Sequence, residues 1–262
     1  MANLATNKGN IRCGNSATTA AYVKGINYAI SKFSQLRATL YLDAAHGGWI
    51  GWGNNLQLLV STITSSLGSN IFKLRGFTLN KANYQPLGQL CPFQTTNGFQ
   101  NTYCTVAQNK GQPCCNDPCN FIGSGNVANN ELNYAMMLYH AFTNAVPGFT
   151  PHFVIDTSRN GVPNSRSNCG EWCNIRNARL GIQPTAATAA PSLIDAYYWW
   201  KAPGEDDGCT QILPDGSTCN RYDSNCGSAD SIGSLPGEPR APQAGQWFDY
   251  EVKLLVSDPA TH

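Results

Sequence analysis

The sequence predicts an α/β fold built from parallel β/α units. Segments with helical spacing of apolar residues alternate along the chain with short apolar runs, a pattern typical of such units. Each apolar run ends in a polar residue, namely Asp43, Asn80, Asp156 or Lys201. In β/α barrels the active site lies at the carboxyl ends of the strands, so these four residues point to one shared site. Four strands are too few to close such a barrel.

The individual elements follow from periodicity and turn residues. Helices are predicted at residues 16–34, with Ser16 as the cap, and at 55–67, 129–144 and 242–256. Strands are predicted at residues 38–43, 72–79, 152–156 and 196–201. Two stretches rich in glycine, proline and cysteine lie between them. We expect a disulfide-held insertion at 88–125 and a long active-site loop at 202–241.

The composition narrows the class of ligand. Charged residues make up 13% of the chain, the net charge is +1, and no cluster of lysine and arginine stands out. A nucleic-acid-binding protein would carry a basic stripe, so that class is disfavoured. The apolar runs are far too short to span a bilayer, so no membrane partner is expected. Six tryptophans and eleven tyrosines favour a neutral ligand that stacks on aromatic rings, and sugars fit best.

The eleven cysteines indicate an oxidising compartment and structural disulfides. They lack a paired C-x2-C or a nearby histidine in ligand spacing, so disulfides are favoured over zinc and no metal is expected. The first residues contain no apolar signal segment. A secretion signal would therefore lie in an N-terminal part outside this sequence, or the start is not the natural one.

Residues 41–52 (YLDAAHGGWIGW) are the most informative stretch of the chain. An acid, an imidazole and two indoles follow one predicted strand within ten residues. An isolated Asp or Trp is usually a helix cap or a core residue. The glycine-rich spacing here disfavours a helix and favours a loop that displays Trp49 and Trp52 as platforms for sugar rings.

This stretch resembles the YLDAGHAGWLGW segment of glycoside hydrolase family six, the cellobiohydrolases and endoglucanases. Other family segments have counterparts in the same order, RGLATNVANY at 74–84, IDTSRNG at 153–161, GDWCN at 170–174, KPGGECDG at 201–208 and PAPQAGAWF at 240–248. The matches span residues 2–256. They are specific as a set, although each one alone is weak.

The resemblance implies a partial, distorted β/α (TIM-like) barrel that lacks its first strands. The family's general acid lies in a YDLPDRDC-type segment, and no such motif occurs in this sequence. Residues 2–7 resemble LANLVTN, which follows that part of the family, so about three β/α units would precede Met1 in a full member. We therefore expect residues 1–262 to be the C-terminal part of a single catalytic domain, with Met1 an internal methionine rather than the start of a divergent gene.

The resemblance also implies roles for individual residues. Asp207 matches the family's proposed general base, and Asp43 matches a carboxylate at the cleavage point. Substrate-binding positions are matched by His46, Trp49, Trp52, Asn80, Trp172, Lys201 and Glu205. The tryptophans would stack on sugar rings, and His46 and Asn80 would bind hydroxyls. No cofactor is implied.

The chemistry of inverting glycosidases agrees with this assignment. They need a protonated acid and an ionised base about 6.5–9.5 Å apart, with water between them. Lys201 near Asp207 would keep that carboxylate ionised. The alternative for the Glu205–Asp207 run is a solvated acidic loop. Asp206 stands where many relatives have another residue, so no role is expected for it. Asp156 and Arg159 match a family pair for which a structural ion pair is expected.

The resemblance further implies a disulfide between Cys173 and Cys226, and Cys209 and Cys219 could close a local loop. Ten cysteines can pair within the chain, and Cys13 matches a family cysteine whose partner lies upstream.

The expected function is inverting hydrolysis of β-1,4-glucosidic bonds in cellulose and cello-oligosaccharides by a secreted monomer. The long 202–241 loop favours a cellobiohydrolase-like roof over the cleft. Loss of general-acid catalysis costs about 10²–10⁴-fold, so this chain alone is expected to bind glucan without turning it over. The alternatives are a non-catalytic glucan-binding relic and a disulfide-rich structural protein.

Overall fold

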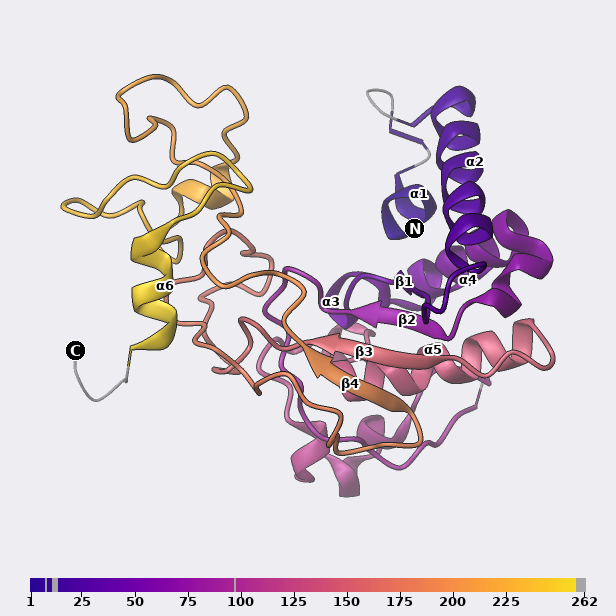
Figure 1. Ribbon diagram of the computed structural model, residues 1–262. Helices are drawn as coiled ribbons and strands as arrows, with labels where there is room; N and C mark the ends of the chain where they lie inside the picture. The colour runs from indigo at the N-terminus through magenta and orange to yellow at the C-terminus, as the bar shows by residue number, and fades with distance from the viewer. Residues whose placement is uncertain (8, 11–13, 97, 258–262) are drawn as a thin grey trace. The chain divides into compact units, whose positions relative to one another are not determined.

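The computed structural model describes residues 1–7, 9–10, 14–96 and 98–257. Its four strands form one sheet in chain order (Figure 1), and they are β1 (Tyr41–Asp43), β2 (Gly76–Leu79), β3 (His152–Asp156) and β4 (Ile194–Tyr198). The β1–β2 and β2–β3 pairs are parallel, and Leu42, Phe77 and Phe153 lie level across them. The predicted α/β class is confirmed.

Six α-helices accompany the sheet within the described residues. They are α1 (Ala2–Thr6), α2 (Ser16–Phe33), α3 (Gly47–Ile50), α4 (Gly53–Leu67), α5 (Glu131–Ala145) and α6 (Asp249–Val256). Short 3₁₀ helices are η1 (Gly68–Lys73), η2 (Tyr103–Thr105), η3 (Ala107–Asn109), η4 (Pro113–Cys115), η5 (Ile122–Ser124) and η6 (Ser224–Gly227). In the part of the chain that the structure describes, none of these helices has the length and apolar character to cross a membrane.

Several predicted boundaries differ from the structure. The cap of α2 is Asn15, whose Oδ1 accepts from the backbone N–H of Thr18 at 2.8 Å, and not Ser16. The strand expected from residue 72 begins at Gly76, because η1 extends to Lys73. The last helix begins at Asp249 and not at 242, since the stretch before it contains a proline and Gly245 with φ +84°.

The chain divides into two compact units. The first contains Met1–Lys81, Gly88–Ile155 and Ala186–Ala196. Its core lies where α5 packs on the sheet, and the rings of Phe77 on β2 and Phe142 on α5 stack with centroids 4.5 Å apart. Such aromatic packing adds to the free energy gained by burying apolar area.

The second unit contains Ala82–Leu87, Asp156–Thr185 and Tyr197–His262. One small core in it is formed by Tyr84, Ile175, Ala178 and Leu255. Its loops are long, and η6 is the one helix described between β4 and α6. In such a unit disulfides constrain the chain where regular structure does not.

The disulfides agree with the expected pairs. Cys173–Cys226 and Cys209–Cys219 are both present in the second unit. In residues 88–125 Cys91 pairs with Cys114, and Cys104 pairs with Cys115. All ten cysteines within the described residues are disulfide-bonded, whereas Cys13 lies outside them. The assignment of 88–125 as an insertion, and of 202–241 as an active-site loop, stays a prediction.

The 88–125 segment is fastened to the start of α5 by amide side chains. The carbonyl oxygen of Cys114 accepts hydrogen bonds from Nδ2 of Asn129, Asn130 and Asn133, at 3.0, 3.2 and 3.2 Å. Asn130 is also the N-cap of α5, because its Oδ1 accepts from the backbone N–H of Asn133. One turn of sequence therefore both caps the helix and anchors the disulfide-rich segment.

Candidate active site

The segment that follows β1 in the first unit displays the predicted sugar-binding side chains. The glycine-rich stretch expected to be a loop includes the four-residue helix α3, which begins directly after His46. The rings of His46 and Trp49 lie with centroids 6.3 Å apart and planes inclined by 54°, and both residues are half-buried. Trp52 Nε1 donates to the carbonyl oxygen of Gly48 at 3.1 Å, which fixes the indole at the start of α4.

Buried polar groups hold this segment from beneath. Glu131 Oε1 accepts from the backbone N–H of Gly47 at 2.8 Å, and Asn126 Nδ2 donates to the carbonyl oxygen of the same glycine at 2.9 Å. The Tyr134 hydroxyl donates to the carbonyl oxygen of Ala44 at 2.7 Å. Burial raises the pKa of Glu131 to about 8, although the Gly47 N–H opposes the shift. At neutral pH this carboxyl group is therefore largely protonated.

Two glycines let the segment approach its support. A Cβ atom on Gly47 would lie 2.9 Å from the carbonyl oxygen of Ala128, and one on Gly51 would collide with the Ala128 Cβ. The glycine spacing, which we interpreted as indicating a loop, is thus required because the backbone here packs closely against its neighbours. It brings the backbone of α3 against residues 126–128.

Asp43 is the last residue of β1, and Asn80 directly follows Leu79, the last residue of β2. Asp43 is exposed at the end of its strand, and its Oδ1 accepts from the backbone N–H of Ala45 at 3.2 Å. Asn80 is fully buried with φ +61°, and its backbone N–H donates to the carbonyl oxygen of Ala45 at 2.8 Å. The two strand ends are therefore tied together through Ala45, which also has a positive φ of 60°.

The second unit contains Asp207, and its carboxylate is surrounded by donors. Arg159 reaches it with both terminal nitrogens, Nη1 to Oδ2 at 2.7 Å and Nη2 to Oδ1 at 3.0 Å. Oδ2 also accepts from the Tyr84 hydroxyl at 2.9 Å and from the backbone N–H of Asn174 at 3.0 Å. Lys201 Nζ lies 3.3 Å from Oδ1. Only 5% of the Asp207 side chain is exposed.

These contacts fix the charge of Asp207. Burial acts to raise its pKa, but the charge and hydrogen bonds of Arg159, the charge of Lys201 and the Asn174 N–H outweigh it, and the pKa lies below its ordinary value. The expectation that Lys201 helps to keep Asp207 ionised is consistent with this geometry. Arg159 is the larger influence, and it pairs with Asp207 and Glu251.

Lys201 connects the remaining predicted residues of this unit. Its Nζ donates to Glu205 Oε1 at 3.2 Å and to the carbonyl oxygen of Asp206 at 3.1 Å. Its backbone N–H donates to Asp156 Oδ2 at 3.0 Å. Glu205 has 45% of its side chain exposed, so it is accessible to a ligand. Trp172 is half-buried in the loop directly before Cys173.

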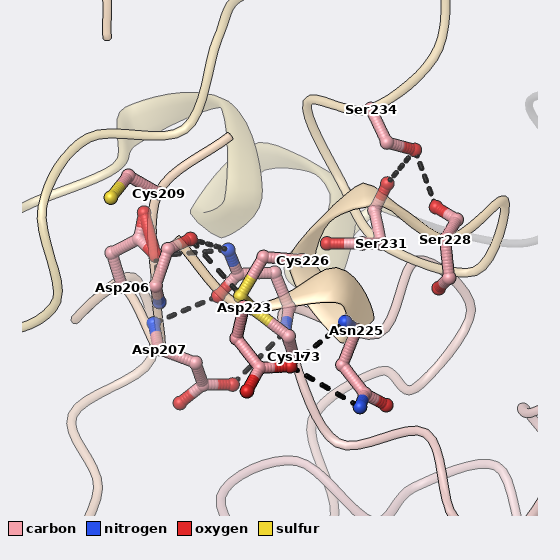
Figure 2. The surroundings of a disulfide bond; sticks show 12 residues. Cys173, Asp206, Asp207, Cys209, Asp223, Asn225, Cys226, Ser228, Ser231 and Ser234 are labelled. Atoms are coloured by element: carbon pink, nitrogen blue, oxygen red, sulfur yellow. Dashed lines mark hydrogen bonds between the residues drawn. A yellow bond between two sulfur atoms is a disulfide. The ribbon is translucent and has the colours of Figure 1, made fainter. Parts of the chain in front are cut away.

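Asp206, for which no role was expected, is fully buried and hydrogen-bonded beside Asp207 (Figure 2). Its Oδ1 accepts from Asn174 Nδ2 at 2.9 Å and from the backbone N–H of Gly208 at 2.7 Å. Burial raises the pKa of Asp206 to about 7, and the charge of Asp207 adds to the shift, against the Asn174 and Gly208 bonds and Lys201. Two adjacent aspartates thus have opposite pKa shifts.

Sequence reasoning missed several supporting residues. Tyr84 and Asn174 lie inside motifs that we recognised, yet only the fold shows that both donate to Asp207. Glu251 and Glu131 carry no local signal beyond an acid within an apolar pattern. A charged residue on an otherwise apolar helix face is the one sign that could have drawn attention to them.

The sequence profile of Glycosyl hydrolases family 6 matches residues 1–259. The chain belongs to this family. Similar family-six relatives include "Exoglucanase 3" of Agaricus bisporus, 34% identical over 261 residues, and the "Probable 1,4-beta-D-glucan cellobiohydrolase C" of Neosartorya fischeri, 33% identical over 263 residues. Each alignment covers 98% of this chain, but 50% and 48% of those proteins.

Solved family-six structures match the fold as well. The CcCel6A catalytic domain complexed with p-nitrophenyl beta-D-cellotrioside superposes with a TM-score of 0.71 at 32% identity, over 97% of this chain and 59% of that one. CcCel6C from Coprinopsis cinerea gives 0.70 at 31% identity, over 98% and 60%. The family-six fold is a distorted TIM-like barrel, so the expected partial barrel is confirmed. The chain spans about half the length of the curated relatives it matches.

Proposed function

We propose that this chain acts in the hydrolysis of β-1,4-glucosidic bonds of cellulose with inversion, in the manner of a cellobiohydrolase. The observation that carries the proposal is the Asp207 carboxylate, held ionised by Arg159 and Lys201 within a motif of the family. Relatives named as an exoglucanase and as cellobiohydrolases support the substrate. A solved neighbour holds p-nitrophenyl beta-D-cellotrioside, which supports a cello-oligosaccharide as ligand.

The roles proposed for the first unit concern binding. Trp49 and Trp52 offer indole faces for glucose rings, whose C–H faces are apolar. His46 and Asn80 would bind sugar hydroxyls, and Asp43 would place an accessible carboxylate at the cleavage point. The network of Asn126, Glu131 and Tyr134 beneath the segment keeps these groups in fixed positions, which reduces the entropy lost on binding.

The roles proposed for the second unit concern the water nucleophile. Oδ2 of Asp207 accepts three hydrogen bonds, whereas Oδ1 accepts from Arg159 at 3.0 Å and faces Lys201 at 3.3 Å. A carboxylate offers about four acceptor positions. We therefore place the attacking water on the Oδ1 side, where a small movement of Lys201 toward Glu205 frees an acceptor position. Trp172 and Glu205 would contact the sugar next to the cleaved bond.

The disulfide-bonded cysteines support a secreted protein, because such bonds persist in oxidising compartments. The sequence has no YDLPDRDC-type segment, so we assign the general acid to no residue of this chain. A glucan-binding role without turnover is the second candidate, and the half-buried indoles of Trp49, Trp52 and Trp172 favour it.

Binding and hydrolysis are tested separately. Calorimetry with cellohexaose on this chain should show binding that Trp49→Ala and Trp172→Ala weaken. Tyr28→Ala, which removes an exposed ring of α2, should leave it unchanged. Reducing-sugar release from amorphous cellulose is then measured for a fusion that supplies the acid-bearing segment of a relative. Release of α-anomeric product, lost in Asp207→Ala, supports hydrolysis. Binding with no release in the fusion would favour the second candidate.

A further inference from the structure

Asp206 departs from the family pattern. The family motif KPGGECDG has a cysteine where this chain has Asp206, directly before the proposed base. Its side chain is fully buried, and its Oδ2 has no hydrogen-bond partner in the part of the chain that the structure describes. A buried carboxyl with an unpartnered oxygen lowers stability unless its other contacts compensate. The contacts of Asp206 therefore need an explanation.

Asn174 connects the two adjacent aspartates. Its Nδ2 donates to Asp206 Oδ1 at 2.9 Å, and its Oδ1 accepts from the backbone N–H of Asp207 at 2.8 Å. Its own backbone N–H donates to Asp207 Oδ2 at 3.0 Å. Figure 2 shows Asp206 and Asp207 beside the Cys173–Cys226 disulfide. Asn174 thus contacts both the backbone and the carboxylate of Asp207 while Asp206 holds its amide nitrogen.

The backbone conformation of Asn174 is unfavourable by itself, so its side-chain hydrogen bonds help to maintain it. Its φ is +46°, in the left-handed region that asparagine tolerates better than most residues but still at a cost. With Nδ2 bound to Asp206 and to the carbonyl oxygen of Gly208, at 2.9 and 3.2 Å, the amide plane is fixed. The amide oxygen is then directed at the Asp207 N–H.

We propose that Asp206 is a positioning residue for Asp207, which it orients by fixing the side chain of Asn174. The inference rests on the proposed function only in making Asp207 the group that acts on the substrate. Asp206 itself is fully buried, so its carboxyl group is not exposed to solvent.

The charges around Asp206 are consistent with a neutral carboxyl there. Asp206, Asp207 and Glu251 are three buried acids, and they face two cations, Arg159 and Lys201. With all five ionised the cluster has one negative charge in excess. One proton on Asp206 or Glu251 balances it, and the pKa values of both are raised to about 7, chiefly by burial. Glu205 has 45% of its side chain exposed, so water partly screens its charge.

Two substitutions separate the hydrogen-bond link from the charge. Asp206→Asn removes the charge but keeps an oxygen that accepts from Asn174 and Gly208. Asp206→Ala removes both. Amide hydrogen exchange, followed by NMR on the unliganded chain, should be about tenfold faster at Asn174 and Asp207 in D206A than in D206N. The Asp207 carboxyl, titrated by ¹³C NMR, should have a higher pKa in D206A than in D206N, because only D206A loosens the Asn174 N–H bond.

Equal exchange rates and equal Asp207 titration in D206A and D206N would overturn the proposal. If D206A does not fold, Asn174→Gly breaks the same link at its other end, and glycine accepts the positive φ. Asn174→Gly should then reproduce the rise of the Asp207 pKa with Asp206 intact, and an unchanged pKa would also overturn it. These measurements need no turnover. Failure of glucan binding by this chain, or of hydrolysis by the fusion that carries the acid-bearing segment, would remove the proposed function and leave the positioning result standing.

Discussion

The Arg159 guanidinium and the Asp207 carboxylate form a bidentate ion pair, with Nη1···Oδ2 at 2.7 Å and Nη2···Oδ1 at 3.0 Å. Both side chains are almost fully excluded from solvent. Burying both charges costs desolvation free energy, which is offset only when further hydrogen bonds and charges satisfy the pair. Tyr84, Asn174 and Lys201 supply those partners, so the pair is fixed in place and the Asp207 pKa is held low.

Removing one member of this pair should be strongly destabilising. Arg159→Ala leaves Asp207 buried without its main counterion, and we expect a loss of about 3–5 kcal/mol in the free energy of unfolding. Arg75→Ala breaks the pair with Asp195, in which the arginine side chain is 45% exposed, and should cost about 0–1 kcal/mol. Urea denaturation of both variants checks the contrast. Equal losses would contradict the buried-pair argument.

The ionisation of Glu131 should make the free energy of unfolding depend on pH. A carboxyl whose pKa is raised by folding, here from 4.5 to about 8, binds more protons in the folded state than in the unfolded state. Its contribution is therefore fully present below about pH 4.5 and is lost as the pH rises toward 8, by up to a few kcal/mol. Glu131→Gln is always neutral and keeps an acceptor for the Gly47 N–H. The fall in unfolding free energy between pH 5 and 8 should be smaller in E131Q than in the wild type.

A methyl group at Gly51 should disturb the sugar-binding segment. Its φ of −65° suits alanine, so the effect of Gly51→Ala comes from the collision with Ala128 and Asn126 and not from the backbone. We expect a loss of about 1–3 kcal/mol in stability and weaker cellohexaose binding in calorimetry. Gly25→Ala is the matched control, because its Cβ meets nothing within 4 Å on α2, and it should stabilise by up to about 1 kcal/mol.

The disulfides Cys173–Cys226 and Cys209–Cys219 of the second unit should contribute different amounts to the free energy of unfolding. Cys173–Cys226 joins residues 53 apart, and Cys209–Cys219 joins residues 10 apart. Loop-closure entropy then gives a loss of about 4 kcal/mol for the double serine variant of the first pair and about 3 kcal/mol for the second. Because Cys173 precedes Asn174, the first variant should also alter the NMR signals around Asp207. Thermal unfolding with calorimetric detection measures the stability difference.

Much of the fold could be predicted because it depends on local pattern. The apolar runs that end at Asp43, Asn80 and Asp156 are strands or strand ends, and helix α5 falls within two residues of its predicted bounds. The predictions were wrong where contacts with neighbouring residues determine the local structure. Asn15 caps α2 although Ser16 is also a good cap residue, and Gly47 begins a helix because Glu131 and Asn126 bind its backbone.

The sequence could predict which residues belong to the candidate site, but not which of them contact one another. Lys201 and Asp207 are close in sequence, so their proximity could be inferred. Arg159 and Tyr84 are 48 and 123 residues from Asp207, and no periodicity links them to it. For Asp206, the departure from the family motif argued against a role. Burial and the bond to Asn174 became visible only in three dimensions.

The paired disulfides of residues 88–125 also determine how this segment would respond to a protease. Lys110 is exposed and lies between Cys104 and Cys114, so trypsin can cut the chain after it. Cys91–Cys114 and Cys104–Cys115 both connect the two sides of that cut. A nicked molecule would therefore migrate as one species on a denaturing gel until a thiol reductant separates it into two fragments. The segment can thus lose backbone continuity while its ends stay covalently joined.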